Sequence, residues 1–195
     1  MHSYNFFLQH LQINDIIILI KQTNSFSTGT SSMDYKFISE NTLEYIYLHD
    51  CIIDNVTISD SSLIFEFDHI DVFPEHPLNN YPNAKCTGNA ALIFEGFEVI
   101  ESILFDTNNI KKMHIIVEQD SVKRPVDIID LAMEFLVLQS KWKSQNEQYF
   151  LYEFHGTTSD KYRNDFGMFT LKFSNAKVCW NELLNDSWFV NRKTD

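Results

Sequence analysis

Residues Leu43–Phe67 constrain the fold most, because their pattern predicts two β-strands joined by a tight turn. β-Branched and aromatic residues, which favour strands, dominate both halves of the stretch. A turn-forming cluster, Ser59-Asp60-Ser61-Ser62, separates the halves. In the second half, apolar residues occupy every other position from Leu63 to Phe67, the period of a half-buried strand. We therefore predict a β-hairpin at this point in the chain.

Further along the chain, short apolar or alternating segments predict more strands, separated by polar or proline-rich turns. The predicted strands are Ala90–Phe94, Val99–Phe105, Lys112–Glu118, 150–155 and 169–174. The predicted connections are a proline-rich loop at Phe73–Cys86, a bend at 95–97, a turn at 106–109, a loop at Asp120–Pro125 and a polar linker at Lys141–Gln148. The C-terminal part, Val178–Trp188, predicts a strand end that runs into a helical turn. This order indicates an α+β, β-rich fold: a mainly antiparallel sheet or sandwich with one or two helices.

The segment Val126–Leu138 fits two secondary structures. Apolar residues near helical spacing, with Asp127 and Asp130 at the start, favour a helix. Alternation from Leu131 to Val137 would instead suit a strand. Good helix formers are frequent in the segment, so a helix is the favoured interpretation.

Residues 1–32 differ from the rest of the chain. Their formal charges cancel, so the net charge of −12 belongs to residues 33–195. The segment is a flexible or peripheral extension, either a genuine N-terminal helix or upstream sequence before a true start at Met33. Residues 33–195 are expected to form a single globular, β-rich domain.

The acidic charge bears on the kind of partner. A surface this acidic repels phosphate backbones, which argues against nucleic-acid binding. It would attract a basic protein and accelerate the encounter, although acidity also serves solubility alone. The sequence leaves the oligomeric state open.

Other signals concern the compartment. Cys51, Cys86 and Cys179 are odd in number and far apart in sequence, which is typical of reduced thiols. Apart from Ile13–Ile20, which is short and interrupted by Asp15, no segment approaches a membrane span, so we expect no membrane association. No clear signal peptide precedes that run, and the expected compartment is the cytoplasm.

His49, Asp50 and Cys51 are three adjacent residues capable of chemistry. Cysteine and histidine can form a thiolate nucleophile that a carboxylate orients. In a strand, however, His49 and Cys51 would share one face and Asp50 would point away. We therefore expect the trio to be structural, and predict no catalytic residues.

The remaining signals concern ligands and the C-terminal tryptophans. No metal-binding spacing, phosphate-binding glycine loop or dinucleotide fingerprint is present, so neither a metal nor a cofactor is expected. Trp180 and Trp188 either pack a terminal segment onto the sheet or anchor an interface, and packing is the favoured interpretation.

An ordered pattern runs through the chain: Leu48-His49-Asp50-Cys51-Ile52, then Leu63–Phe67, then Ala91–Phe97, and finally Trp180-Asn181-Glu182-Leu183, with Trp188 close behind. It resembles a group of small, uncharacterised proteins of Gram-positive bacteria, some of which resemble immunity proteins of polymorphic toxin systems. The resemblance implies an intracellular protein that neutralises a toxin by binding it, and it carries over no catalytic residue.

The favoured hypothesis is therefore a non-enzymatic, acidic, cytoplasmic binding protein with a basic toxin as partner. Asp68, Asp71 and Glu75, around the proline-rich loop, are the expected contact residues. Two alternatives stay open: a small enzyme that uses a cysteine–histidine pair, and a structural or oligomerisation module.

Overall fold

The computed structural model describes residues 34–106, 122–145, 148–158 and 166–190. The chain divides into two units, Met1–Asp34 and Tyr35–Asp195. The predictions for residues 1–32, for Met33 and for a strand at Lys112–Glu118 fall outside the described residues. The second unit contains every strand and helix of the described residues.

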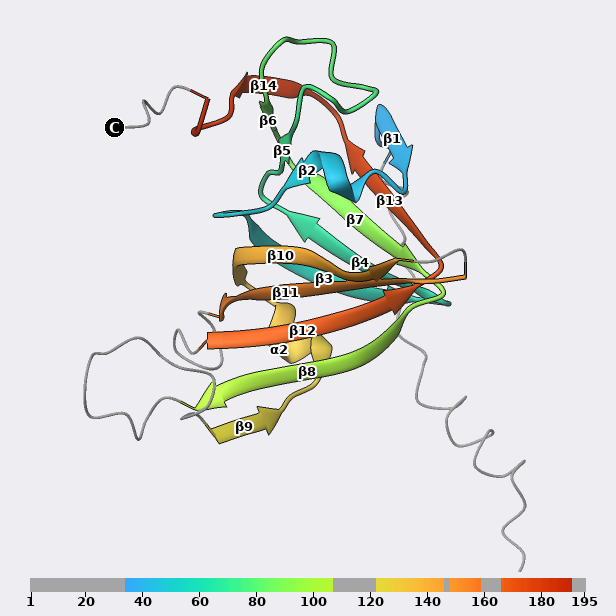
Figure 1. Cartoon of the computed structure of the whole chain (residues 1–195), viewed down its shortest axis with the longest axis vertical. Coiled ribbons are helices and arrows are strands. Elements are labelled where there is room, and N and C mark those ends of the chain that lie inside the picture. The colour runs from blue at the N-terminus through green and yellow to red at the C-terminus, as the bar shows by residue number, and fades with distance from the viewer. Residues whose placement is uncertain (1–33, 107–121, 146–147, 159–165, 191–195) are drawn as a thin grey trace, which may run out of the picture. The chain divides into compact units, whose positions relative to one another are not determined.

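This unit is mainly antiparallel β-structure in two sheets, with one short α-helix (Figure 1). The β-rich fold class predicted from the sequence is confirmed. The elements are β1 (Phe37–Glu40), the 3₁₀ turn η1 (Leu43–Tyr45), β2 (Ile46–Tyr47), β3 (Ile52–Ser59), β4 (Ser62–Phe67), β5 (Asp71–Val72), β6 (Lys85–Thr87), β7 (Ala90–Glu95), β8 (Glu98–Asp106), β9 (Val122–Pro125), α2 (Ile128–Ala132), β10 (Phe135–Gln145), β11 (Phe150–Thr158), β12 (Phe166–Phe173), β13 (Asn175–Trp180) and β14 (Leu183–Asp186).

The larger sheet has ten strands in the order β1-β13-β7-β4-β3-β10-β11-β12-β8-β9. Its two halves meet where β3 pairs with β10, and that pairing covers only two residue pairs. Phenylalanines from the two halves then pack against each other: the ring of Phe65 in β4 lies 5.9 Å from that of Phe154 in β11, and Phe94 in β7 lies 4.9 Å from Phe173 in β12. The sheet therefore folds back on itself around an aromatic core.

The predicted hairpin in Leu43–Phe67 is confirmed as β3 and β4. Ser59 pairs with Ser62, so only Asp60 and Ser61 form the loop, and Asp60 has a φ of 52°, as tight hairpins require. Along β4 the residues alternate between buried and half-buried positions, as predicted. The stretch upstream of Ile52 differs from the prediction, because it forms η1, β2 and a turn instead of a continuous strand.

Two predicted connections and one predicted helical turn contain strands in the structure. The expected loop at 120–125 contains β9, which pairs with β8, and the expected linker at 141–148 holds the second half of β10. The expected helical turn at the C-terminus contains β14. Local sequence suggested two loops and a helical turn, but cross-strand partners hold the backbone of these segments in strands.

The ambiguous segment 126–138 contains both predicted structures in succession. Asp127 caps the helix α2, since its carboxylate accepts a hydrogen bond of 2.8 Å from the backbone N–H of Ile129. The helix ends at Ala132 and Met133 is already extended; Glu134 then has a φ of 51°, and Phe135 begins β10. The bend predicted at 95–97 is confirmed too, with Gly96 at a φ of 60°.

The smaller sheet has four short strands in the order β14-β6-β5-β2, beside the first half of the large sheet (Figure 1). The proline-rich loop between β5 and β6 is organised by Asn79. Its side-chain amide donates to the backbone oxygens of Val72, Phe73 and Asn83, and its side-chain oxygen accepts from the N–H of Tyr81. No helix in the described ranges has the length and apolar character needed to cross a bilayer.

Candidate functional site: an aromatic patch beside a cleft

The residues His49, Asp50 and Cys51 form a turn between the two sheets, and not part of a strand as predicted. Asp50 has a φ of 66°, and its N–H donates to the carbonyl of Val137 in β10. Val137 in turn donates to the carbonyl of Cys51. This turn places the Cys51 side chain in the core, while His49 lies at the surface, so the two side chains do not share a face.

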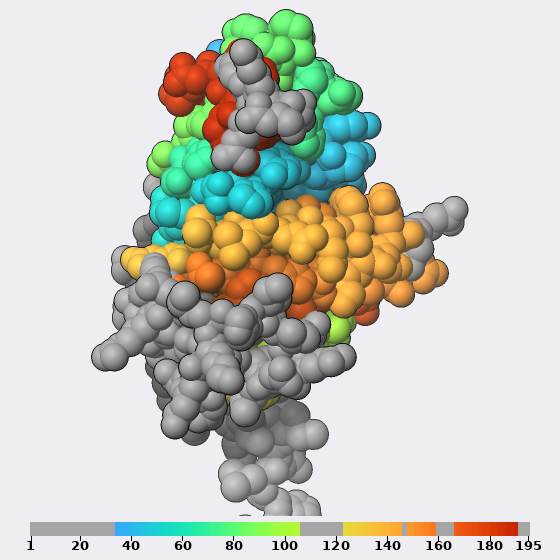
Figure 2. Space-filling view, turned by 60° about the vertical axis from the view of Figure 1, so that its left-hand side comes forward, coloured from blue at the N-terminus to red at the C-terminus, as the bar shows by residue number. Residues whose placement is uncertain are grey.

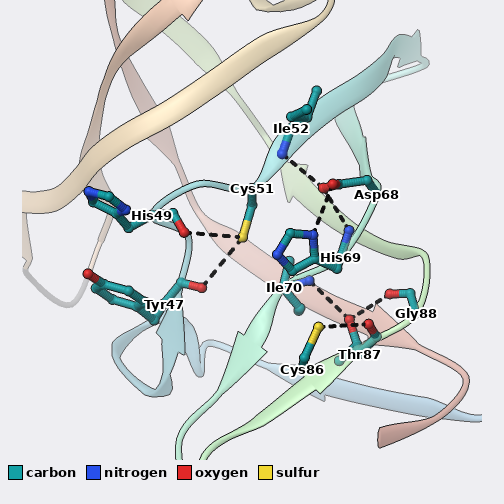
Figure 3. A network of polar contacts seen from close by, with 10 residues as sticks. All are labelled: Tyr47, His49, Cys51, Ile52, Asp68, His69, Ile70, Cys86, Thr87 and Gly88. Atoms are coloured by element: carbon teal, nitrogen blue, oxygen red, sulfur yellow. Dashed lines mark hydrogen bonds and ion pairs between the residues drawn. The ribbon is translucent and has the colours of Figure 1, made fainter. Parts of the chain in front are cut away.

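Cys51 lacks the surroundings of a reactive thiol. Its side chain has no exposed surface, and its sulfur contacts the carbonyl oxygens of Tyr47 and His49 at 3.9 Å (Figure 3). Burial raises the pKa of the Cys51 thiol, and the nearby Asp71 and Asp68 raise it further. The thiol is therefore protonated at neutral pH, which disfavours nucleophilic attack.

His49 and Asp50 lie side by side at the surface. Nδ1 of His49 is 3.1 Å from Oδ2 of Asp50, close enough for an ion pair but outside the angles of a hydrogen bond. The Cys51 sulfur meets His49 at its backbone carbonyl, and the imidazole ring points away from the sulfur (Figure 3). The trio considered as a reactive cluster is thus separated into a buried thiol and a histidine–aspartate pair at the surface.

The three acidic residues predicted to contact a partner differ in exposure. Asp68 is half-buried and structural: Oδ1 accepts from the N–H groups of Ile52 and His69, and Oδ2 lies 2.9 Å from Nδ1 of His69 (Figure 3). Burial favours a higher pKa for Asp68, but these hydrogen bonds outweigh it and lower the pKa. Asp71 is only 1% exposed and cannot contact a partner in this conformation, whereas Glu75 is exposed.

Asp71 lies within the smaller sheet, next to Ser187. Neither carboxylate oxygen has a hydrogen-bond partner in the described residues, and the Ser187 hydroxyl beside it lies outside hydrogen-bonding geometry. Burial raises the pKa of Asp71, with smaller opposing effects from Ser187 and His69. Within the described ranges no group of three or more histidine, cysteine or acidic side chains could hold a metal ion.

The two C-terminal tryptophans have different roles. Trp180 is fully buried, stacks on Phe37 at 5.6 Å and meets the ring of His76 edge-on at 5.1 Å, so it is a core residue as expected. Trp188 is 39% exposed and contacts the ring of His49 at 6.0 Å and that of Phe189 at 5.6 Å.

Trp188 belongs to a group of aromatic rings at the surface that comes from two distant parts of the chain. The ring of Tyr47 stacks on His49 at 5.9 Å and meets Phe189 edge-on at 5.1 Å. We call Tyr47, His49, Trp188 and Phe189 the aromatic patch. In the sequence, the patch is marked only by the spacing of Tyr47 and His49 and by the adjacent pair Trp188-Phe189. Nothing local indicated that these two segments meet.

A cleft of about 650 Å³ adjoins the patch. It lies between the segment from η1 to His49 and the middle of β10, which are neighbours in Figure 2 as the cyan and yellow-orange surfaces. Its lining residues are Leu43, Glu44, Ile46, Tyr47, Leu48, His49, Leu138, Gln139, Ser140, Lys141, Trp142 and Tyr152. The volume lies within the range of ordinary ligand-binding clefts.

Negative charge is concentrated in residues 34–106, the part of the sequence that includes β2. Residues 34–106 hold fourteen acidic side chains and two basic ones, Lys36 and Lys85, while the charges in the remainder of the chain cancel. Glu44 lines the cleft and is exposed, and Asp50 is exposed beside the aromatic patch. The patch and the cleft are thus flanked by carboxylates.

Lys141 also lines the cleft, but its charge is directed away from it. Its ammonium lies 3.1 Å from Glu153, while the neighbouring Trp142 faces the ring of Tyr152 on the opposite face of the strand. Glu153 is almost fully buried and also binds Lys143 at 2.6 Å and His155 at 2.7 Å. Burial alone would raise the pKa of Glu153, but hydrogen bonds from Lys143, His155 and Lys141 outweigh it and lower the pKa to about 2.

Comparisons with protein-family models, with curated proteins and with solved structures find no match for this chain. No relative's activity therefore bears on the site. The function of the site is therefore inferred from the cleft, the aromatic patch and the charged residues around them.

Proposed function

We propose that this chain is a non-enzymatic, acidic binding protein that acts in the cytoplasm and neutralises a basic toxin, in the manner of an immunity protein. The aromatic patch and the adjoining cleft form its contact surface. One observation carries the proposal: an exposed tryptophan in a cluster of rings lies beside a cleft lined by the exposed Glu44, and the exposed Asp50 is paired with His49 of the cluster.

The physical argument comes from the anatomy of protein interfaces. Binding energy concentrates in a few residues, among which tryptophan and tyrosine are enriched, and a polar rim surrounds them. Complementary charge accelerates the encounter and selects the partner. The negative charge of residues 34–106 suits a partner with a positive active cleft, and the resemblance to immunity proteins points to the same role.

The test uses the product of the gene adjacent to the one for this chain as the binding probe. Affinity is measured by calorimetry at low and high salt for the wild type and for Trp188→Ala. We expect a loss of roughly 30-fold or more for the variant, the size of a hot-spot effect. Tyr81→Ala is the matched control, because Tyr81 is 50% exposed and lies outside the patch.

A second variant pair separates charge from packing. Asp50→Asn should slow association and weaken its salt dependence, whereas Asp60→Asn, in the hairpin loop, should change neither. The proposal is wrong if the neighbouring product does not bind, or if it binds equally well to the wild type and to Trp188→Ala.

A further inference from the structure

The strand β10 has a different environment on each of its two edges. On one edge β11 pairs with it over its whole length, from Phe135 to Gln145. On the other edge β3 pairs only with Phe135 and Leu136, and Val137 bonds to the turn at Asp50 and Cys51. Beyond that point no strand in the described part of the chain pairs with this edge.

The cleft lies along this open edge. Five consecutive residues, Leu138–Trp142, line it. Side chains of successive strand residues point to opposite faces, so a wall made of consecutive residues is the edge of a strand and presents backbone N–H and C=O groups. The cleft is therefore bounded on one side by hydrogen-bonding backbone.

Two irregularities limit the usable length of that edge. The pairing of β10 with β11 shifts between Val137 and Gln139 and again between Trp142 and Ser144. Between these bulges Gln139–Trp142 pairs in regular register with Tyr152–His155. Bulges protect edges against indiscriminate pairing, so an added strand would find four residues in regular geometry and no more.

The opposite wall of the cleft offers side-chain selectivity. Glu44 is exposed and contributes a carboxylate, whereas the apolar lining residues Leu43, Ile46 and Leu48 are almost fully buried. The ammonium groups of Lys141 and Lys143 lie within 3.1 Å of Glu153, on the face of β10 opposite to Trp142, so they do not cover the edge. An extended segment lying here would place a basic side chain near Glu44.

We propose that the cleft binds an extended, basic segment of the partner, which adds to β10 as a further strand along Gln139–Trp142 and directs a lysine or arginine to Glu44. Main-chain hydrogen bonds supply affinity in this mode of recognition, and pockets for alternate side chains supply specificity. The identification of the segment as part of a toxin depends on the proposed function; the open edge does not.

The test uses a synthetic octapeptide of alternating lysine and valine, added at up to about millimolar concentration. Binding is followed by amide chemical shifts of the whole protein and by cross-strand contacts between backbone protons. We expect shifts at Gln139–Trp142 and contacts of the β type to that segment. The same peptide N-methylated at alternate positions should bind at least tenfold more weakly, because it lacks donors on one edge. A glutamate–valine peptide should not bind.

A cleft-filling variant checks the location. Leu138→Trp should abolish peptide binding, whereas Leu184→Trp, at a leucine 46% exposed and outside the cleft, should leave it unchanged. Equal binding of the N-methylated peptide, no binding of the lysine–valine peptide, or shifts confined to β1 or β9 would overturn the proposal. So would self-association of the chain through β10 that excludes the peptide.

These outcomes are distinct from failure of the proposed function. If the neighbouring gene product binds and Leu138→Trp does not weaken it, strand addition is wrong while the immunity role stands. If the peptide adds to β10 and no basic toxin binds, the edge is a peptide site with another partner.

Discussion

Two buried polar side chains, His76 and Glu153, lie in different regions of the molecule and are accommodated in opposite ways. His76, in the loop beside the smaller sheet, is 1% exposed, and its ring nitrogens hydrogen-bond to two hydroxyls and a backbone N–H, all neutral groups. Glu153, in the second half of the large sheet, is 2% exposed and lies within 3.1 Å of three basic side chains. One region keeps its buried group neutral and the other keeps it charged.

The hydrogen bonds of His76 fix its protonation state. Nδ1 accepts from the N–H of Leu78 at 3.0 Å, so the proton is assigned to Nε2, which faces the hydroxyls of Ser39 and Thr42. Burial lowers the pKa of His76 to about 4. Burial therefore dominates where the partners are neutral, while hydrogen bonds from two lysines and a histidine overcome the same penalty at Glu153.

The largest expected effect on stability comes from removing the side chain of His76, the buried neutral group. His76→Ala removes a ring that packs on Trp180 and leaves the N–H of Leu78 without its acceptor. We expect a loss of about 3–4 kcal/mol in the free energy of unfolding. Urea denaturation at neutral pH measures it. Glu75→Ala, at the exposed neighbouring position, is the control and should stay within about 0.5 kcal/mol of the wild type.

As the pH falls, we expect the stabilising contribution of His76 to be lost first and that of Glu153 at lower pH. The unfolded chain protonates His76 near pH 6.5 and the folded one near pH 4, so the unfolded state binds more protons between these values and stability falls as the pH falls. Across this pH range the free energy of unfolding should fall by about 3 kcal/mol. For Glu153 the folded pKa is the depressed one, so its contribution is lost between pH 4.5 and 2.

Chemical denaturation at a series of pH values tests this order. His76→Gln, which does not titrate, should remove the decline between pH 6.5 and 4 and keep the decline below pH 4.5. If the variant and the wild type lose stability in parallel throughout, the assignment of His76 as a buried neutral group is wrong.

A smaller effect is expected from neutralising the charged region. Glu153→Gln should cost about 2 kcal/mol, because the buried site loses its charge-assisted hydrogen bonds. The loss is limited because the side chains of Lys141 and Lys143 are 48% and 45% exposed and can return to water. Thermal unfolding at neutral pH measures it. A stabilised variant would show that desolvation of the carboxylate outweighs its ion pairs.

The smallest effect is expected at an exposed ion pair, and it tests whether the ion pairs of Glu153 contribute to stability because they are buried. Glu98 and Lys172 form an ion pair at 3.0 Å on the same half of the sheet, with Glu98 61% exposed. Glu98→Gln should change stability by less than about 0.5 kcal/mol, since exposed pairs contribute little. An effect as large as that of Glu153→Gln would show that burial does not distinguish the two sites.

The sequence predicted the hairpin at β3 and β4, and the strands β7, β8, β11 and β12, because apolar alternation marks half-buried strands directly. It did not predict β2 and β5, which have two residues each and are too short to show a period. The strand β10 was divided between a helix and a linker, since its second half is polar and is held by cross-strand partners.

The candidate site was harder to predict than the fold. Trp188 and the His49–Asp50 pair were noticed in the sequence, but their meeting with Tyr47 and Phe189 depends on the path of the chain between the sheets. Asp71 looked like a surface acid but is buried in β5, the strand between β2 and β6, with Ser187 and His69 near its carboxylate. Local patterns contain no information on such long-range contacts.

The pairing of β1 with β13 has a consequence for synthesis of the protein on the ribosome. Phe37 is opposite Trp180, so the first strand of the sheet must wait for almost the last one to emerge. At about 5–20 residues per second the delay is roughly 7–30 s. Until β13 emerges, β1 and the edge of β7 that pairs with β13 have no partner, which exposes the nascent chain to aggregation.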